Sequence, residues 1–212
     1  MTHSMYRIGC PVVLAHRGGM GSAPENTRAA VAQMLATGVR TLETDVRETS
    51  DGVAVLAHDE TLQRRFGDPR PVSEVTWWEL DLMRDVDDQP ALRLVDLLAE
   101  FPDVGINIDV KSDGAVTPTL RAVREAGAAA RVCLTSFSSE RLDVMARLTR
   151  GRTALGAGAA DVARLVARAR GLTELPGADA VGRAWGRGAG GRRRRCVAAR
   201  CRSRSSTAGC GW

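Results

Sequence analysis

Short apolar runs alternate with amphipathic stretches along most of the chain. A near-continuous apolar run is typical of a parallel strand that is buried on both faces of a sheet. The pattern therefore predicts six parallel strands. Polar or helical sequence separates each run from the next, and the runs lie at 11–15, 41–46, 53–57, 105–110, 131–135 and 153–157.

The segments between several of these runs have apolar residues at helical spacing, and their ends are recognisable. Asn26 or Thr27 would cap the first helix, Thr117 the third, and Ser138 or Ser139 the fourth. Strands that alternate with helices at this spacing predict right-handed βαβ units, in either a closed barrel or an open doubly wound sheet. The expected helices span about 27–38, 94–101, 117–127, 138–151 and 162–171.

The segment 60–93 interrupts this alternation. It contains Pro69, Pro71 and Pro90, and also an adjacent pair of tryptophans at 77 and 78. We expect a small excursion from the sheet that is helical at about 73–83, with Ser73 as its N-cap residue. Such an excursion would cover one end of the sheet.

The composition changes abruptly at residue 182. Residues 182–212 contain nine arginines and no acidic residue, whereas residues 1–181 contain 21 basic and 25 acidic residues. We therefore separate a globular domain at 1–181 from an arginine- and glycine-rich tail at 182–212, which is too poor in apolar residues to offset the entropy of ordering. One interpretation is a disordered tail that binds nucleic acid or an acidic partner. The interpretation that we favour is a shifted reading frame, so that the tail is not native sequence.

Length and composition exclude several classes of protein. A chain of 212 residues with 44% hydrophobic and 26% charged residues is typical of one soluble domain. No apolar run reaches the roughly 18 residues of a membrane-spanning helix, and the first residues do not form a secretory signal. The five cysteines do not form a recognisable disulfide framework. We therefore expect a cytoplasmic protein without disulfides.

Two of the three histidines directly follow predicted strands. His16 follows the run at 11–15, and His58 follows the run at 53–57. Ligands bind at the carboxyl ends of the strands in parallel α/β folds, so we expect both side chains at the same edge of the sheet. Two histidines at such an edge are suited to general acid–base catalysis.

Three acidic residues lie near the ends of other predicted strands. Glu43 and Asp45 are two residues apart and share one face of their strand, and Asp109 lies near the end of the run at 105–110. Buried carboxylates need a counter-charge. Hard oxygen ligands favour a divalent cation, Mg²⁺ or Ca²⁺, and the alternative of salt bridges to an arginine stays open.

Two cationic residues accompany these groups. Lys111, the single lysine of the chain, shares a face with Asp109, and Arg17 directly follows His16. Glycines at 18, 19 and 21 would allow the backbone to approach a ligand closely, and the Arg17 guanidinium is suited to a phosphate. The complete set of residues is suited to metal-assisted cleavage of a phosphoester.

These residues form a series of motifs that resembles the glycerophosphodiester phosphodiesterase family. The resemblance extends from about residue 12 to 137, and more weakly to 181. It implies a TIM (β/α)8-type barrel and hydrolysis of glycerophosphodiesters to sn-glycerol 3-phosphate and an alcohol. The motifs are His-Arg-Gly at 16–18, Pro-Glu-Asn-Thr at 24–27, Glu-x-Asp at 43–45, Asp-Gly at 51–52, His-Asp at 58–59 and Asp-Val-Lys at 109–111.

The resemblance also implies a role for each residue. Glu43, Asp45 and Asp109 would bind the divalent cation, and Arg17 and Lys111 would contact the phosphate of a small-molecule substrate. His16 and His58 would act as the acid–base pair, with the order of their roles left open. One histidine would deprotonate a substrate hydroxyl that attacks phosphorus, the other would protonate the leaving alcohol, and water would open the cyclic phosphate.

The chain departs from the family pattern in two ways. Asp109 stands where many members have glutamate, and the late Trp-Thr motif has no counterpart after residue 181. A seventh strand is expected to begin at Ala178, so the barrel would be incomplete and its activity impaired. Three alternatives stay open: a lysophospholipase D-like phosphodiesterase, a non-catalytic nucleic-acid binder that uses the tail, and an inert product.

Overall fold

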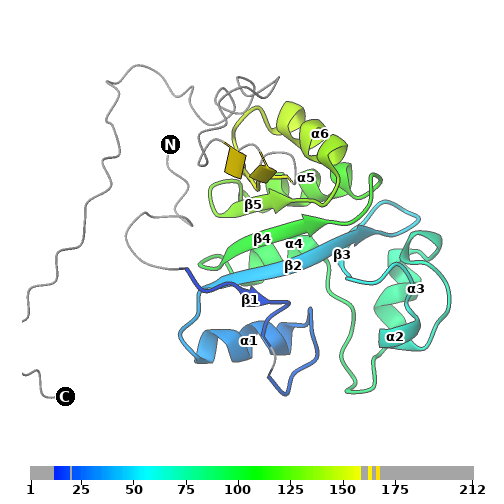
Figure 1. Cartoon of the computed structure of the whole chain (residues 1–212). Coiled ribbons are helices and arrows are strands. Elements are labelled where there is room, and N and C mark those ends of the chain that lie inside the picture. The colour runs from blue at the N-terminus through cyan, green and yellow to red at the C-terminus, as the bar shows by residue number, and fades with distance from the viewer. Residues whose placement is uncertain (1–11, 20, 159–161, 164–165, 168–212) are drawn as a thin grey trace, which may run out of the picture.

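The computed structural model describes residues 12–19, 21–158, 162–163 and 166–167. Its centre is one six-stranded sheet in which β1, β2, β4, β5 and β6 follow one another in that order, and β3 pairs with β2. Figure 1 shows the sheet with its helices. The strands are β1 (Ala15–His16), β2 (Thr41–Glu48), β3 (Ala54–Leu56), β4 (Gly105–Val110), β5 (Val132–Thr135) and β6 (Ala154–Leu155).

The order of the parallel strands distinguishes a barrel from a doubly wound sheet. The neighbours β1–β2, β2–β4, β4–β5 and β5–β6 are all parallel, and they are arranged in chain order. A doubly wound sheet reverses its strand order at a switch point. The described part of the chain contains no such reversal, so the sheet is consistent with an incomplete TIM-type barrel.

The prediction that all six strands are parallel is wrong for β3. This strand is antiparallel to β2, with Val46 opposite Leu56 and Glu48 opposite Ala54. The connection from β2 to β3 is a tight turn in which Gly52 adopts a φ of 75° and donates to the Thr49 carbonyl. So short a connection joins antiparallel neighbours, because a parallel crossover needs a dozen or more residues.

Four helices cover the apolar face of the sheet. They are α1 (Arg28–Ala36), α4 (Leu94–Glu100), α5 (Val116–Glu125) and α6 (Ser139–Thr149). Alternate strand residues face these helices, because side chains alternate between the faces of a strand. Leu42 and Val46 on β2 and Ile106 and Ile108 on β4 belong to this main core. The intervening residues of the same strands therefore point to the opposite face.

The helix boundaries test the predicted caps. Thr27 caps α1 and accepts from the Ala30 N–H, and Ser138 caps α6 and accepts from the Arg141 N–H, as predicted. Thr117 is not a cap, because α5 begins at Val116 with Ala115 as its N-cap residue. Pro118 is compatible with this earlier start, since the first turn of a helix does not need its N–H groups.

The excursion at 60–93 contains three short helices, α2 (Gln63–Phe66), η2 (Val72–Glu74) and α3 (Trp77–Leu82). Ser73 is not the N-cap of α3, because it lies within η2. Thr76 caps α3 instead and forms a capping box with Glu79. In Figure 1, α2 and α3 lie beside β3 at the right-hand side of the picture, apart from α1, α4, α5 and α6. A second apolar cluster anchors the excursion and consists of Val55, Leu62, Val72, Val75, Leu80 and Ala91.

Several predictions fall on other parts of the chain. The seventh strand at 178 and the tail at 182–212 lie outside the described residues. Of the predicted helix at 162–171, the structure describes only residues 162–163 and 166–167, which are helical. Among the described residues, no helix has the length and apolar character to cross a membrane.

Candidate active site

The predicted acidic residues lie in adjacent rows on the inner face of the sheet. His16 on β1 pairs in register with Glu43 on β2, and Glu43 pairs with Asn107 on β4. One row further toward the carboxyl ends, Asp45 pairs with Asp109. The parallel register of these three strands therefore brings one histidine, three carboxylates and an amide together.

A sharp turn directly after β1 positions His16 and Arg17. Arg17, Gly18 and Gly19 all have a positive φ, and the Arg17 N–H donates to the Glu43 carbonyl at 2.8 Å. A Cβ atom at Gly18 would lie 2.6 Å from Ala30 Cβ, so the turn and α1 approach too closely for a side chain there. The His16 ring is 63% exposed, and its Nε2 is 3.9 Å from Glu43 Oε2.

His58 lies at the same rim, the edge of the sheet that carries Asp45 and Asp109, although the strand that precedes it is antiparallel. β2 continues beyond Asp45 to Glu48, and β3 returns antiparallel, so that the Ala57 N–H donates to the Asp45 carbonyl at 3.0 Å. The residue after Ala57 is therefore level with the carboxylates of β2. His58 Nδ1 is 2.7 Å from Asp59 Oδ1, an interaction that leaves Nε2 available.

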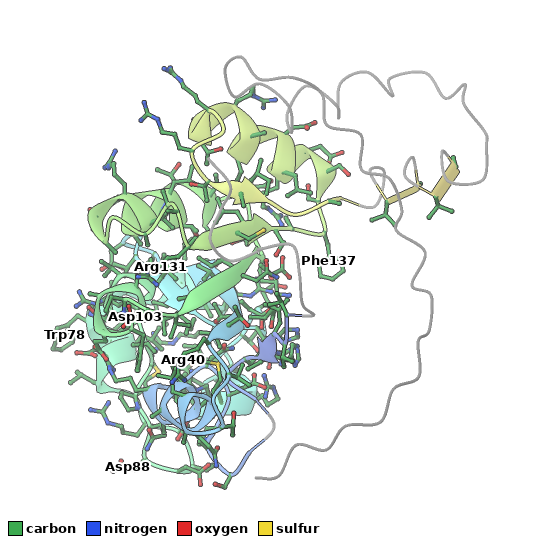
Figure 2. The ribbon with its side chains drawn as sticks, turned by 90° about the vertical axis from the view of Figure 1, so that its left-hand side faces the viewer. Arg40, Trp78, Asp88, Asp103, Arg131 and Phe137 are labelled. Atoms are coloured by element: carbon green, nitrogen blue, oxygen red, sulfur yellow. The ribbon has the colours of Figure 1, made fainter. Side chains whose placement is uncertain are left out.

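Lys111 lies between two of the carboxylates. Its Nζ is 2.8 Å from Asp45 Oδ1 and 2.6 Å from Asp109 Oδ2. Burial by itself would lower the pKa of the Lys111 ammonium, but the hydrogen bonds to Asp109 and Asp45 outweigh burial and raise this pKa. Phe137 follows β5, and its ring lies 5.5 Å from Nζ. This ring is 91% exposed and projects outward (Figure 2).

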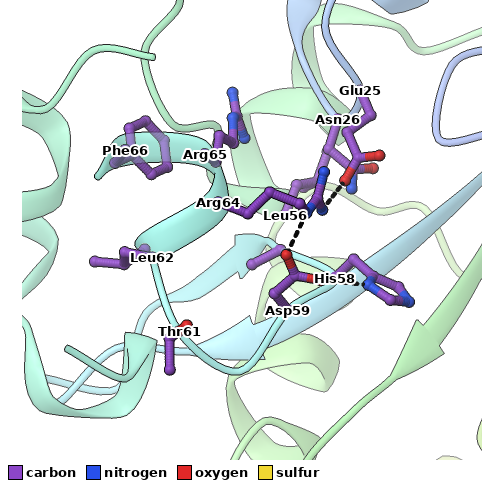
Figure 3. Close-up of a pocket in the computed structure, with 11 residues that line it drawn as sticks. Glu25, Asn26, Leu56, His58, Asp59, Thr61, Leu62, Arg64, Arg65 and Phe66 are labelled. Atoms are coloured by element: carbon purple, nitrogen blue, oxygen red, sulfur yellow. Dashed lines mark hydrogen bonds and ion pairs between the residues drawn. The ribbon is translucent and has the colours of Figure 1, made fainter. Parts of the chain in front are cut away.

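Arg17 bridges the strand residues to the following loop. Its Nε is 3.0 Å from Asp45 Oδ2, without the alignment of a hydrogen bond, and its Nη1 donates to Glu25 Oε2 at 3.0 Å. Glu25 in turn accepts from Arg64 Nη2 at 2.6 Å. Arg64 also donates to Asp59, the partner of His58, as Figure 3 shows. One chain of ion pairs thus joins the two sides of the site.

Four oxygens at this rim are buried without a hydrogen-bond partner among the described residues: Glu43 Oε2, Asp45 Oδ2, Asn107 Oδ1 and Asp109 Oδ1. Burial, and then the charge of Asp45, raise the pKa of Glu43. Carboxylate and amide oxygens that are buried without a hydrogen bond are suited to a hard cation. In the described part of the chain, however, no three carboxylate, histidine or cysteine side chains are placed closely enough to hold a metal ion.

The structure brings six of the seven predicted site residues into one contiguous cluster: His16, Arg17, Glu43, Asp45, Asp109 and Lys111. The seventh, His58, connects to this cluster through Asp59, Arg64 and Glu25. None of these three residues, nor Asn107, has a predicted role. Glu25 and Asp59 belong to quoted motifs, whereas no sequence signal distinguishes Arg64 among the arginines.

Residues 16–166 match the model of the glycerophosphoryl diester phosphodiesterase family, and the chain belongs to this family. The chain is 36% identical over 158 residues to the probable glycerophosphodiester phosphodiesterase 2 of Mycobacterium tuberculosis, which covers 74% of this chain and 60% of the relative. It is 33% identical over 126 residues to a lysophospholipase D of Mus musculus, covering 51% of this chain and 38% of that protein.

A solved structure supports the same relationship. The glycerophosphodiester phosphodiesterase from Agrobacterium tumefaciens superposes with a TM-score of 0.61 at 31% identity, covering 66% of this chain and 63% of that one. Solved members of the family have a TIM-barrel-like fold, and the parallel sheet of this chain is consistent with an incomplete barrel. The chain therefore spans less than two thirds of the length of these relatives.

Proposed function

We propose that this protein hydrolyses small glycerophosphodiesters to sn-glycerol 3-phosphate and an alcohol, with the help of a divalent cation. The observation that supports this proposal best is the cluster of buried oxygens on Glu43, Asp45, Asn107 and Asp109, which lack a hydrogen-bond partner among the described residues and lie beside two cationic side chains. Membership of the family supports the reaction class. A cytoplasmic location and a role in lipid and glycerol metabolism are part of the same proposal.

The oxygen donors of this cluster are of the kind that a hard divalent cation prefers, and the three carboxylates would have to move closer together to hold one. Glu43, Asp45 and Asp109 would hold Mg²⁺ or Ca²⁺ through carboxylate oxygens. When bound, the cation would neutralise negative charge on the phosphate during the reaction. Among the described residues of the cluster, the three carboxylates lie beside the two permanently charged side chains Arg17 and Lys111, and Glu43 also lies beside His16. A divalent cation would reverse this excess of negative charge and match the single charge of a phosphodiester.

Lys111 and Arg17 would bind the phosphate. Lys111 Nζ contacts both Asp45 and Asp109, so a cation held by these carboxylates would compete with the ammonium. Phosphate oxygens are the natural new partners for the displaced ammonium. Arg17 keeps its contact with Glu25, which fixes the guanidinium beside Asp45.

The two histidines would move the protons. One takes the proton of a substrate hydroxyl as the hydroxyl oxygen attacks phosphorus, and the other gives a proton to the oxygen of the departing alcohol. Water then opens the cyclic phosphate that this displacement forms. His16 is exposed beside Glu43, and His58 presents Nε2 because Asp59 engages Nδ1, so both rings are available to a substrate.

Hydrolysis of glycerophosphocholine tests the proposal. We expect activity that a chelator removes and that Mg²⁺ or Ca²⁺ restores. His16→Ala and His58→Ala should each lower kcat by about 10²- to 10⁴-fold, which is the range for a lost general acid or base. His3→Ala is the matched control, because His3 is the histidine of the sequence that does not follow a predicted strand. Full activity in both variants, or in the presence of chelator, would contradict the proposal.

A second candidate is a lysophospholipase D-like activity on the same site. The identity of 33% to the lysophospholipase D of Mus musculus supports it. The kcat/KM ratio for lysophosphatidylcholine and glycerophosphocholine separates the two candidates. We expect glycerophosphocholine to be the better substrate, and a preference for the acylated substrate would favour the second candidate.

A further inference from the structure

Arg64 connects two loops that are distant in the sequence. It lies on α2, directly after the loop of His58, and its guanidinium contacts the carboxylates of both Asp59 and Glu25. Glu25 belongs to the loop between β1 and α1, 39 residues earlier in the chain. Figure 3 shows the two carboxylates converging on this one side chain.

The first partner, Asp59, also contacts His58. Asp59 uses Oδ2 for Arg64 and Oδ1 for His58 Nδ1, at 2.7 Å. A carboxylate that accepts from Nδ1–H selects the tautomer in which Nε2 is unprotonated. The His58 backbone is held as well, because its carbonyl accepts from Arg47 Nε at 3.1 Å. Arg64 therefore fixes the carboxylate that orients the ring.

The second partner, Glu25, also contacts Arg17. Glu25 uses Oε1 for Arg64 and Oε2 for Arg17 Nη1, at 2.6 and 3.0 Å. Arg17 is only 16% exposed and reaches Asp45 through Nε. Each carboxylate thus uses one oxygen for Arg64 and the other for a predicted site residue.

The ionisation of Asp59 and Glu25 stabilises their contacts with Arg64. The hydrogen bond from Arg64 lowers the pKa of Asp59 to about 2, and His58 contributes to the same shift. Burial alone would raise the pKa of Glu25, but the hydrogen bonds from Arg64 and Arg17 outweigh burial and lower this pKa. Both carboxylates are therefore ionised at neutral pH, and the loss of Arg64 would leave them without the cation that holds them together.

We propose that Arg64 is a positioning residue that sets the orientation of the His58 imidazole through Asp59 and of the Arg17 guanidinium through Glu25. This inference rests on the proposed function for the roles of His58 and Arg17. An ordinary exposed ion pair contributes little to stability, and its two residues do not position any other side chain. Arg64 differs because both of its partners contact the predicted site residues directly.

The orientation of His58 can be measured without any turnover. Long-range ¹H–¹⁵N correlation spectra of the imidazoles, recorded at about pH 8.5 where histidine is ordinarily neutral, report which nitrogen carries the proton. We expect His58 to be mainly the Nδ1–H tautomer in the wild-type protein and to lose this preference in Arg64→Ala and in Asp59→Asn. Glu25→Gln should leave the His58 tautomer unchanged, because it weakens the contacts of Glu25 with Arg64 and Arg17 but leaves the contact between Arg64 and Asp59 in place.

Arg70→Ala is the matched control, since Arg70 also holds two carboxylates, Asp68 and Glu79, within the excursion. It should not change the His58 tautomer. An unchanged tautomer in Arg64→Ala, or an equal change in Arg70→Ala, would overturn the proposal. If Arg64→Ala does not fold, Arg64→Lys replaces it, because a lysine offers a single ammonium in place of the planar fork and should still weaken the tautomer preference.

Kinetics supply a second measurement if the chain hydrolyses glycerophosphocholine. Arg64→Ala should lower kcat by about 10- to 100-fold through His58, as is usual for residues that orient a functional group. Its effect through Arg17, a phosphate-binding residue, should appear in KM. In the His58→Ala background, the same substitution should lower kcat by less than about threefold, because coupled residues are not additive. Additive losses would contradict positioning through His58. An inactive wild-type chain would count against the proposed function and leave the tautomer measurement to decide the role of Arg64.

Discussion

Removal of one carboxylate from the cluster should stabilise the metal-free protein and weaken its binding of a cation. We choose Glu43→Gln, because Glu43 Oε2 is buried without a hydrogen-bond partner and 3.9 Å from His16. Burial and the charge of Asp45 raise its pKa above the ordinary value of 4.5. The ionised form of Glu43 is therefore unfavourable in the folded protein unless a cation is present.

The expected gain in stability of the metal-free Glu43→Gln variant can be estimated from the burial of the side chain. Glutamine keeps a polar group at this position and removes only its charge. A buried polar group without a partner costs about 1–3 kcal/mol, and a charged one more, so the gain is the part of the cost that is due to the charge. The Glu43 side chain is 18% exposed, so the lower end of this range applies. A gain of about 1 kcal/mol would raise Tm by about 2–4 °C for a chain of this length. Because the pKa of Glu43 is raised in the folded state, the folded protein binds more protons at this group, and the contribution of Glu43 to stability is lost as pH rises above 4.5. The advantage of Glu43→Gln should grow over the same range.

A bound cation should make the wild-type protein more stable than Glu43→Gln, the reverse of the order expected without the cation. At a concentration of about 100 times Kd, Mg²⁺ or Ca²⁺ would stabilise the wild-type protein by about 2.7 kcal/mol. If Glu43→Gln weakens binding about tenfold, the stabilisation falls to about 1.4 kcal/mol. Thermal unfolding with and without the cation, at about pH 5 and pH 8, measures both effects.

Glu100→Gln is the control for this substitution, because Glu100 pairs with Arg28 at the surface. It should neither raise Tm nor change the response to the cation. If Glu43→Gln lowers the Tm of the metal-free protein and leaves the cation response unchanged, the carboxylate cluster is not a cation site.

Two further predictions concern the loops of the site. Gly18→Ala should destabilise the protein by about 1–3 kcal/mol in urea unfolding, because φ is 96° and the new Cβ would meet Ala30 Cβ; Gly38→Ala, with a positive φ but open space, should cost less. Asp59→Asn should lose stability relative to the wild-type protein above about pH 4, and the difference should vanish as pH falls toward 2, since the lowered pKa of Asp59 contributes stability only where the carboxylate is ionised. A difference that persists below pH 2 would contradict this assignment.

The parallel part of the fold could be predicted because each of its strands overlaps a short apolar run of the sequence. The apolar run at 105–110 coincides with β4 (Gly105–Val110), and its neighbours differ from their strands by only a few residues. The same runs place Glu43, Asp45 and Asp109 on one face, since side chains alternate along a strand. The cluster of carboxylates was therefore accessible from this alternation together with the positions of the three residues near the carboxyl ends of predicted parallel strands.

The orientation of β3 could not be read from its apolar character. A strand of three buried residues looks the same in either direction, and the decisive feature is the short turn around Gly52. His58 was placed at the correct rim for a wrong reason, since an antiparallel strand brings its carboxyl end back toward Asp45. The length of the connection was the signal that the sequence offered.

The ion pairs around Arg64 were beyond the reach of the sequence. They join the loops after β1 and β3, and the two carboxylate partners are half-buried loop residues without periodicity. The chain contains 29 arginines and one lysine. Residue type therefore singled out Lys111, whereas Arg64 could be recognised only from its two carboxylate partners.

Two different physical rules assemble the site. The positions of the carboxylates depend on the register between β2 and β4, where Asp45 pairs with Asp109 while Leu42 pairs with Ile106 in the core. A slip of one residue would bury the acids and expose the core, so hydrophobic packing itself enforces this half of the site. Packing does not fix His58 in the same way, because its ring is more than a third exposed and follows a short hairpin strand. The orientation of the His58 ring therefore depends on directional ion pairs. For this reason we expect substitutions at Asp59 and Arg64 to change the orientation of His58 and to leave the carboxylate cluster intact.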